Sequence, residues 1–518
     1  SRALTEVHQE GIRFPPVKLV AEGVLDQRLV DIMLLNVRAP TQNWGDLKAQ
    51  LAAMNTGERK VHEMIRRFGI ATFRAGIAEL LDLGERGARR VLADIPDGDY
   101  GFTDYMDEDA PGGLPCRITL ALRIRGDSAE MDFTGSDPQL AASLNMPTGG
   151  NPRHILLMVG WNYVLYTLDP TVLLNGGLLR PCTCIVPEGT VLNPVFPAAV
   201  GMRSMTCTRL QGVIMGAFQR AVPERLPAGP ASGGPMMNVN TTDNRTGRRI
   251  MAAIDPITGG AGGAPSGDGM DGSGANGGFL KNTPVEINEA EVPLRILRYG
   301  LEPDTGGAGL HRGGLATVLE FRVQAPGTVV TARNRDRTHF RSWGVQGGRP
   351  GAPATFWRNP DTPRAENLGN TDVVTLDPGD VIRMVCSGAS GWGPPWQRPV
   401  QAVLADVAAG KVSAESAARD YGVVPGDEAA TAARRAAMAA EPQPDFDAGP
   451  ERAAFEQVWT AANYVALTEA LAAMPVHWRH FAKRRIFAAV AADPVRRGDG
   501  TEVRAALAAL HAEFPQIA

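Results

Sequence analysis

The stretch "GGAGGAPSGDGMDGSGANGG" at residues 259–278 raises the question on which the fold of this 518-residue chain depends. Ten of its twenty residues are glycine, which loses more conformational freedom on folding than any other residue. A flexible linker would combine Gly and Ser with polar filler. Here aspartates are spaced among the glycines, and a second glycine cluster follows at residues 306–314. We therefore favour a rigid, ligand-facing wall, with a disordered linker as the alternative.

The glycines do not match a nucleotide-binding motif. No Gly-Lys-Ser/Thr closes the stretch, as a phosphate loop requires, and it does not lie between a clear strand and a helix. A carboxylate in a glycine-lined, water-poor pocket has its pKa raised and acts as a general acid or base. Asp268, Asp271 and Glu286 are therefore the catalytic candidates. The alternative for each is an Asx-turn within its own loop.

Four further residues are candidates for substrate binding. Asn145 and Asn282 carry amides that hold an amide or a carboxylate by hydrogen bonds. Asp304 and Arg312 flank the tight turn in "DTGGAGLHRGG". Arg312 either clamps a carboxylate or phosphate with two parallel hydrogen bonds, or pairs with Asp304 and only fastens the loop.

Hydrophobic periodicity predicts an α+β fold. Apolar residues recur at spacings of three and four residues between residues 44 and 92, which indicates helices. From residue 95 to residue 137 the period changes toward two, which indicates strands, with a hairpin turn at Gly126-Asp127. Residues 152–168 predict a buried helix. The expected regions are a helical and hairpin part (1–150), a central part with glycine-rich loops (151–293), a β-rich sandwich or barrel (294–425), and a linker with a small α-helical C-terminal appendage (426–518).

Composition excludes some classes of protein. Fifty-two basic and fifty-six acidic residues give a net charge of −4, and no basic arm is present, so we expect no nucleic-acid partner. No run of apolar residues is long and uninterrupted enough to span a membrane, and no signal peptide is visible. We therefore expect no membrane partner. Five cysteines, few and odd in number, indicate a reducing compartment, which is the cytoplasm.

Several motifs, in order, resemble one family. They are "MDFTGSDPQLAASLNMP", "LLNGGLLRPCTCIVPEGTVLNPVFPAAVG", "GDGMDGSGANGG…NTPVEINEAEVP" and "LEPDTGGAGLHRGG". Over roughly residues 5–425 the chain resembles the hydantoinase B/oxoprolinase family. The resemblance implies a hetero-oligomer in which this subunit works on a small-molecule substrate with a hydantoinase A-type ATPase subunit. The partner binds most of the ATP, and the complex opens a hydantoin, 5-oxoproline or lactam ring.

Two other functions remain open. Relatives in the family use the same apparatus to carboxylate ketones such as acetone or acetophenone. The third alternative is a non-catalytic scaffold that only positions the ATPase subunit.

The resemblance also implies a divalent metal, Zn, Mn or Mg. Relatives carry a segment ahead of the "QEG" motif with a His-His-Ala-Asp stretch that looks like metal ligands, and this stretch is absent here. His8, next to "QEG", is the one candidate ligand that the resemblance points to. A surface histidine without a metal is the alternative.

Overall fold

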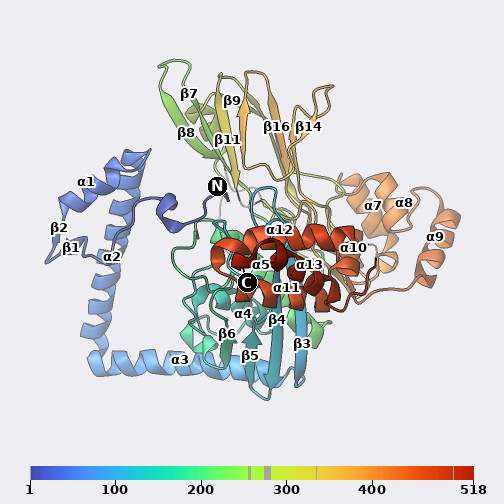
Figure 1. Ribbon diagram of the computed structural model, residues 1–518, viewed down its shortest axis with the longest axis horizontal. Helices are drawn as coiled ribbons and strands as arrows, with labels where there is room; N and C mark the ends of the chain where they lie inside the picture. Colours follow the sequence, from blue (N-terminus) through green and yellow to red (C-terminus); the bar gives the residue numbers. More distant parts are fainter. Residues whose placement is uncertain (1, 255–257, 274–281, 334, 494, 518) are drawn as a thin grey trace.

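The computed structural model describes residues 2–254, 258–273, 282–333, 335–493 and 495–517. It shows a mixed α/β protein with several open sheets and a helical C-terminal part (Figure 1). None of the sheets formed by these residues closes on itself, so no barrel is present among them. No helix in this described part of the chain has the length and apolar character needed to cross a bilayer.

The first sheet has the order β3-β4-β5-β6. Its strands are β3 (Gly98–Met106), β4 (Cys116–Arg125), β5 (Ser128–Asp132) and β6 (Cys182–Ile185). Arg125 pairs with Ser128 across Gly126-Asp127, which confirms the predicted hairpin. The predicted buried helix is α4 (Ile155–Leu168), which packs on α5 (Arg203–Ala221). Helix α5 in turn covers β3 and β4.

Two further sheets share a second hydrophobic core. Their strand orders are β14-β13-β16-β10-β9 and β15-β11-β7-β8. The strands are β7 (Met236–Thr242), β8 (Arg249–Ile254), β9 (Leu294–Leu301), β10 (Thr317–Val323), β11 (Thr328–Arg333), β13 (Thr355–Arg358), β14 (Glu366–Asn367), β15 (Val373–Leu376) and β16 (Val381–Val385). Burial alternates along β7, as expected for a strand with one covered face. Val239, Phe321 and Leu376 meet in this core.

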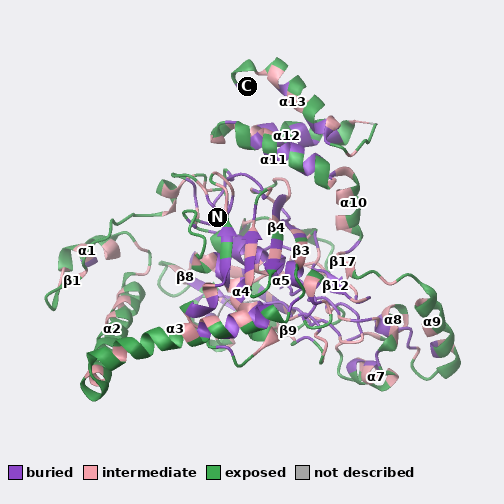
Figure 2. Ribbon diagram, turned by 90° about the horizontal axis from the view of Figure 1, so that it is seen from below, coloured by how far each residue is buried: buried purple, intermediate pink, exposed green. Residues whose placement is uncertain are grey.

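An N-terminal arm, which we define as residues 12–83, projects from the body (Figures 1 and 2). It contains β1 (Val20–Ala21), β2 (Val24–Leu25), α1 (Gln27–Leu35), α2 (Pro40–Phe68) and the first half of α3 (Ile70–Ala93). Helix α2 ends at Phe68, and its C-cap is Gly69, where φ is +80°. None of the 29 described residues of α2 is buried, whereas the C-terminal half of α3 is packed against the body.

The C-terminal part is helical. Its helices are α7 (Val400–Ala408), α8 (Ala414–Asp420), α9 (Glu428–Ala440), α10 (Pro450–Val458), α11 (Ala461–Ala473), α12 (Val476–Ala492) and α13 (Thr501–Glu513). Helix α9 lies inside the stretch predicted to be a linker. The Asp427 side chain caps its first turn by accepting from Ala430 N, and alanine has the highest helix propensity, so the Ala-rich stretch folds.

Lys483 of α12 fastens the C-terminal helices to the first sheet. Its Nζ donates to Asp109 Oδ2 and Asp137 Oδ2, each at 2.8 Å, and to Pro115 O at 2.7 Å. The lysine side chain is 4% exposed. Burial alone would lower the lysine pKa, but Asp109 and Asp137 raise it on balance, so the ammonium is charged at neutral pH.

Lys483→Met is expected to lower the free energy of unfolding by about 3–5 kcal/mol, because it leaves two buried carboxylates without their counter-charge. Chemical denaturation measures the change. Arg484→Met, at the exposed neighbouring position, is the matched control and is expected to change stability by less than about 0.5 kcal/mol. Equal effects of the two substitutions would contradict the role assigned to Lys483.

Candidate functional site

Three glycine-rich segments cross one another as extended backbone. They are residues 258–272, 305–314 and 386–393, which we call the glycine wall. Ala261 N donates to Met270 O at 2.9 Å, Gly314 N to Ala261 O at 2.8 Å, and Ala389 N to Gly314 O at 3.1 Å. The described part of the opening stretch is therefore folded into a hydrogen-bonded layer, and residues 274–278 lie outside the described residues.

The glycines of the wall are required because backbone packs directly against backbone. A Cβ at Gly260 would lie 2.1 Å from Gly314 O, and one at Gly269 would lie 2.0 Å from Ala261 O. A Cβ at Gly313 would lie 2.0 Å from Ala389 O. These distances are far inside van der Waals contact. The space that glycine leaves at these three positions is thus filled by opposing backbone of the wall.

Gly313→Ala is expected to lower the free energy of unfolding by about 3 kcal/mol, the upper end for overpacking, because the opposing atom is a carbonyl oxygen that cannot rotate away. The control is Gly45→Ala in α2, where a Cβ meets nothing within 4 Å. Alanine is the better helix former, so this control is expected to raise stability by up to about 1 kcal/mol. A Gly313→Ala chain as stable as the wild type would contradict the packing described here.

A cluster of opposite charges lies on the wall and brings three of the predicted residues together. Arg398 makes a two-pronged ion pair with Asp268, with Nη1–Oδ1 at 2.6 Å and Nη2–Oδ2 at 2.7 Å. Arg312 donates its main-chain N–H to Asp268 Oδ1 at 2.8 Å and its Nη1 to Asp271 Oδ1 at 3.0 Å. Lys411 Nζ lies 2.8 Å from Asp271 Oδ2. Arg312 thus pairs with Asp271 rather than with Asp304.

The cluster holds both aspartates ionised. Burial alone would raise the pKa of Asp268, but its hydrogen bonds and charge pairing with Arg398 lower it on balance. Burial acts in the same way on Asp271, and Lys411, Leu315 N and Arg312 lower its pKa. The shift is opposite in direction to the raised pKa expected from a water-poor pocket. An ionised carboxylate at neutral pH suits a base or a charge-holding group and does not suit a general acid.

Sequence reasoning missed three members of the cluster: Arg398, Asp406 and Lys411. Arg398 Nη2 also donates to Asp406 Oδ2 at 2.8 Å, so one guanidinium joins two acids. Arg398 follows the "GWGPPW" run, and Asp406 and Lys411 lie in the helical segment after it. The one available signal was the resemblance itself, which extends through these residues to about residue 425.

A cleft of about 580 Å³ lies beside the wall. Its lining includes Asp304, the backbone of Gly306 and Gly307, and three arginines: Arg341, Arg349 and Arg419. Asp304 has φ +61° and accepts from Ser413 N at 2.7 Å, which holds the loop to the start of α8. The arginines are partly paired with acids at the rim, so the cleft is polar and suits a small hydrophilic molecule.

The other predicted residues lie apart from the cluster. Asn145 is fully buried, and its Nδ2 donates to three main-chain carbonyls while its Oδ1 accepts from Leu140 N. Its amide therefore braces the loop that contains it. Asn282 is exposed, and so is Glu286 in the first turn of α6 (Val285–Glu291), which packs against β8 and β9. The substrate and catalytic roles of these residues stay predictions.

The "QEG" segment meets a second family motif on the body. Val7 N donates to Pro197 O at 2.8 Å, and the Glu10 carboxylate accepts from Val200 N at 3.0 Å. His8 is exposed, and its ring lies edge-on to Phe196 at 5.6 Å. No three His, Cys, Asp or Glu side chains among the described residues converge as metal ligands. These residues alone do not fit the implied metal.

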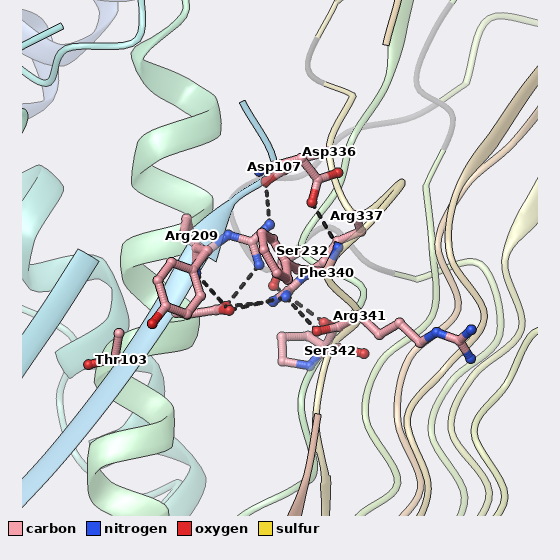
Figure 3. Close-up of polar contacts among 12 residues, drawn as sticks. Thr103, Asp107, Arg209, Ser232, Asp336, Arg337, Phe340, Arg341 and Ser342 are labelled. Atoms are coloured by element: carbon pink, nitrogen blue, oxygen red, sulfur yellow. Dashed lines mark hydrogen bonds and ion pairs between the residues drawn. The ribbon is translucent and has the colours of Figure 1, made fainter. Parts of the chain in front are cut away.

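A buried ionic network ties the first sheet to the loop after β11. Asp104 of β3 accepts from Arg209 Nη1 of α5 at 2.9 Å and from Arg337 Nη2 at 2.8 Å, and all three side chains are fully buried. Arg209 also pairs with Asp336, next to Arg337 (Figure 3). The loop runs on to Ser342, whose Oγ lies 2.6 Å from Ser390 Oγ of the wall. The network therefore positions the wall on the helix and sheet below it.

Comparison with known proteins adds independent information. The beta chain of caprolactamase from Pseudomonas jessenii is 34% identical over 454 residues, which are 83% of this chain and 76% of that protein. The B-type chain of a putative D-/L-hydantoinase from Pseudomonas sp. (strain NS671) is 30% identical over 429 residues, 81% of this chain and 71% of that protein.

Two solved structures are similar. The ATP-dependent caprolactamase from Pseudomonas jessenii superposes with a TM-score of 0.72 at 30% identity, over 84% of this chain and 76% of that chain. A nucleotide-free structure of acetone carboxylase has a TM-score of 0.75 at 19% identity, over 97% of this chain and 73% of that chain, and this likeness shows the fold alone.

The fold and site define a mixed α/β protein whose charged cluster stands on a glycine-packed layer. The family model described as hydantoinase B/oxoprolinase matches residues 1–395, and the chain belongs to the hydantoinase B/oxoprolinase family.

Proposed function

We propose that this chain is the hydantoinase B-type subunit of an ATP-dependent amidohydrolase that opens a cyclic amide such as a lactam, a hydantoin or 5-oxoproline. The observation that carries the proposal is the similarity to the beta chain of caprolactamase, at 34% identity over 83% of the chain. The partner is a hydantoinase A-type ATPase subunit, which binds most of the ATP, and the complex is a hetero-oligomer. The chain works in the cytoplasm, where its five buried, unpaired cysteines stay reduced.

Within the site, we assign a positioning role to the charged cluster on the glycine wall, called the wall cluster. Its members are Asp268, Asp271, Arg312, Arg398, Asp406 and Lys411. Asp268 and Asp271 are ionised and hold Arg312 and Arg398 in fixed positions, and Arg312 Nη1 lies behind Gly306, whose backbone lines the polar cleft. A guanidinium held in this way stabilises negative charge on a substrate oxygen without reorganising during the reaction. The cleft, with Asp304 at its edge, receives the substrate. Glu286 remains a candidate base, and Asn145 and Asn282 remain candidates for amide recognition.

The experiment is a turnover assay of the chain assembled with a hydantoinase A-type subunit. The complex is incubated with ATP and, in separate reactions, caprolactam, hydantoin or 5-oxoproline, and ring-opened product and ADP are both measured. Ring opening that depends on ATP and on both subunits supports the proposal. ATP turnover without ring opening of any of these substrates, by a correctly assembled complex, contradicts it.

A ketone carboxylase subunit is the second candidate, because relatives in the family carboxylate ketones such as acetone or acetophenone. The assay therefore includes acetone or acetophenone with ATP and labelled bicarbonate. Label fixed into an acid-stable product identifies a carboxylase. The scaffold alternative predicts turnover that is unaffected by substitutions in the wall cluster.

A further inference from the structure

Helix α2 carries a strict heptad pattern. With Trp44 at position a, apolar side chains follow at every a and d position but one. The eight positions are Trp44, Leu47, Leu51, Met54, Glu58, Val61, Ile65 and Phe68. A repeat of 3.5 residues over this length, about 37 Å of helix, is the sequence pattern of a coiled coil and not of a helix on a globular core.

Much of the apolar stripe is not packed against any other described part of the chain and is exposed to solvent. Met54 is 61% exposed, Val61 is 41% exposed and Phe68 is 49% exposed. Trp44, Leu47 and Leu51 are half-buried at the end of α2 that α1 contacts. Beyond the bend at Gly69 the stripe continues along α3. Exposed apolar residues in such a row mark a surface that binds another protein.

Apart from Glu58 in the stripe and Lys48 beside it, the charged residues of α2 lie on its outward face. Arg59, Lys60, Glu63, Arg66 and Arg67 occupy the outward b, c and f positions. The flanking e positions hold Lys48, Asn55 and His62, and the flanking g positions between them hold Gln50, Gly57 and Met64. A second copy of α2 therefore meets no row of like charges along either flank, so the helix is compatible with itself.

We propose that α2 of one chain pairs with α2 of a second copy as an antiparallel coiled coil. Residues 55–68 hold four basic and two acidic residues, a net +2, whereas Asp46 and Lys48 cancel in residues 40–54. A parallel pair would place the two basic ends together, and an antiparallel pair separates them. The helix dipoles also oppose each other only in the antiparallel arrangement.

The pattern sets the register of this pair. Trp44 lies opposite the second copy's Phe68, Leu51 opposite its Val61, and Met54 opposite its Glu58, with Asn55 beside the two-fold axis. Glu58 is the one polar residue in the stripe. A polar side chain at a single a position specifies register at a cost in stability. Pairing through α2 does not use the cleft or the wall, so it is independent of the reaction catalysed.

The full-length chain is tested by sedimentation equilibrium at micromolar concentration. We expect a dimer, and we expect Val61→Asp and Phe68→Asp each to weaken it by at least roughly tenfold. Thr56→Asp, at an outward f position of the same helix, is the matched control and is expected to leave the dimer intact. Glu58→Leu is expected to tighten it. The hydrophobic cores do not include Val61 or Phe68, and circular dichroism verifies that each variant is folded.

Cross-linking tests the direction of pairing with a short bis-maleimide. The five native cysteines are buried, so introduced ones react selectively. Asn55→Cys is expected to cross-link with itself. Lys48→Cys is expected to cross-link only when mixed with His62→Cys. A monomeric chain, a dimer that Val61→Asp does not weaken, or a Lys48→Cys chain that cross-links alone would each overturn the proposal. A monomer in which Val61→Asp instead releases the ATPase subunit would also overturn it.

Discussion

Asparagine in place of Asp104 is expected to lower the free energy of unfolding by about 3–5 kcal/mol. The carboxylate is completely buried between Arg209 and Arg337, with Arg452 Nη1 at 3.7 Å. An amide of the same shape leaves these guanidinium groups without their central counter-charge. Urea denaturation followed by circular dichroism measures the change.

The control for Asp104→Asn lies on the same strand. Asp99 also pairs with an arginine, Arg125, at 2.8 Å, but its side chain is 68% exposed. Asp99→Asn is expected to cost less than about 1 kcal/mol, as surface ion pairs do. If both substitutions cost the same, burial does not set the strength of the Asp104 network, and the prediction is wrong.

The Asp104 prediction includes a dependence on pH. Burial alone would raise the pKa of Asp104, but Arg337 and Arg209 lower it on balance, well below its usual range. The folded-state pKa thus lies below the unfolded value of about 3.9, so the carboxylate stabilises the fold above that pH and loses its contribution as the pH falls toward the folded value. Asp104→Asn is expected to flatten the loss of stability on acidification, measured as unfolding midpoints between about pH 5 and pH 2, the range around and below the unfolded pKa.

Asp271→Asn is expected to lower kcat/KM of the assembled complex by about 100-fold. The amide can still accept from Leu315 N, but it no longer neutralises Arg312 and Lys411, so Arg312 shifts behind the cleft-lining Gly306. Asp268→Asn is expected to act in the same direction through Arg398. The reaction is the one that the turnover assay identifies.

The control for Asp271→Asn is Asp243→Asn. Asp243 lies in the turn between β7 and β8 and accepts from Arg245 N at 2.9 Å within its own loop. The Asp243→Asn substitution is expected to leave kcat/KM unchanged. Partner binding and unfolding temperature are measured for all variants. An Asp271→Asn complex that assembles and turns over like the wild type would contradict the assigned role and would support a scaffold.

Local patterns were sufficient for the elements that depend on neighbouring residues. The β4–β5 hairpin follows from alternation around Gly126-Asp127, and α4 follows from a helix-length apolar run. The ion pair of Asp268 with Arg398 joins residues 130 positions apart, and no periodicity predicts such a pairing. The density of glycine correctly predicted a folded layer. It did not reveal that backbone fills the space beside Gly260, Gly269 and Gly313, because an absent side chain does not indicate what takes its place.

The arm illustrates another limit of sequence patterns. Apolar periodicity in α2 predicts a helix with one covered face, but it does not say whether the cover comes from the same chain. The Ala-rich segment around α9 shows the reverse case. Its composition is typical of a linker, yet one cap at Asp427 and strong helix formers are enough to order it.

The buried network at Asp104 has a consequence for synthesis on the ribosome. Arg452 Nη2 donates to Thr103 O across 349 positions of the chain, and Lys483 reaches Asp109 across 374. Both contacts depend on residues that are translated long after the first sheet. Contacts at such separation close slowly. The nascent first sheet must therefore wait, with Asp104 and Asp109 short of their final partners, until the segment that contains Arg452 and Lys483 has left the exit tunnel.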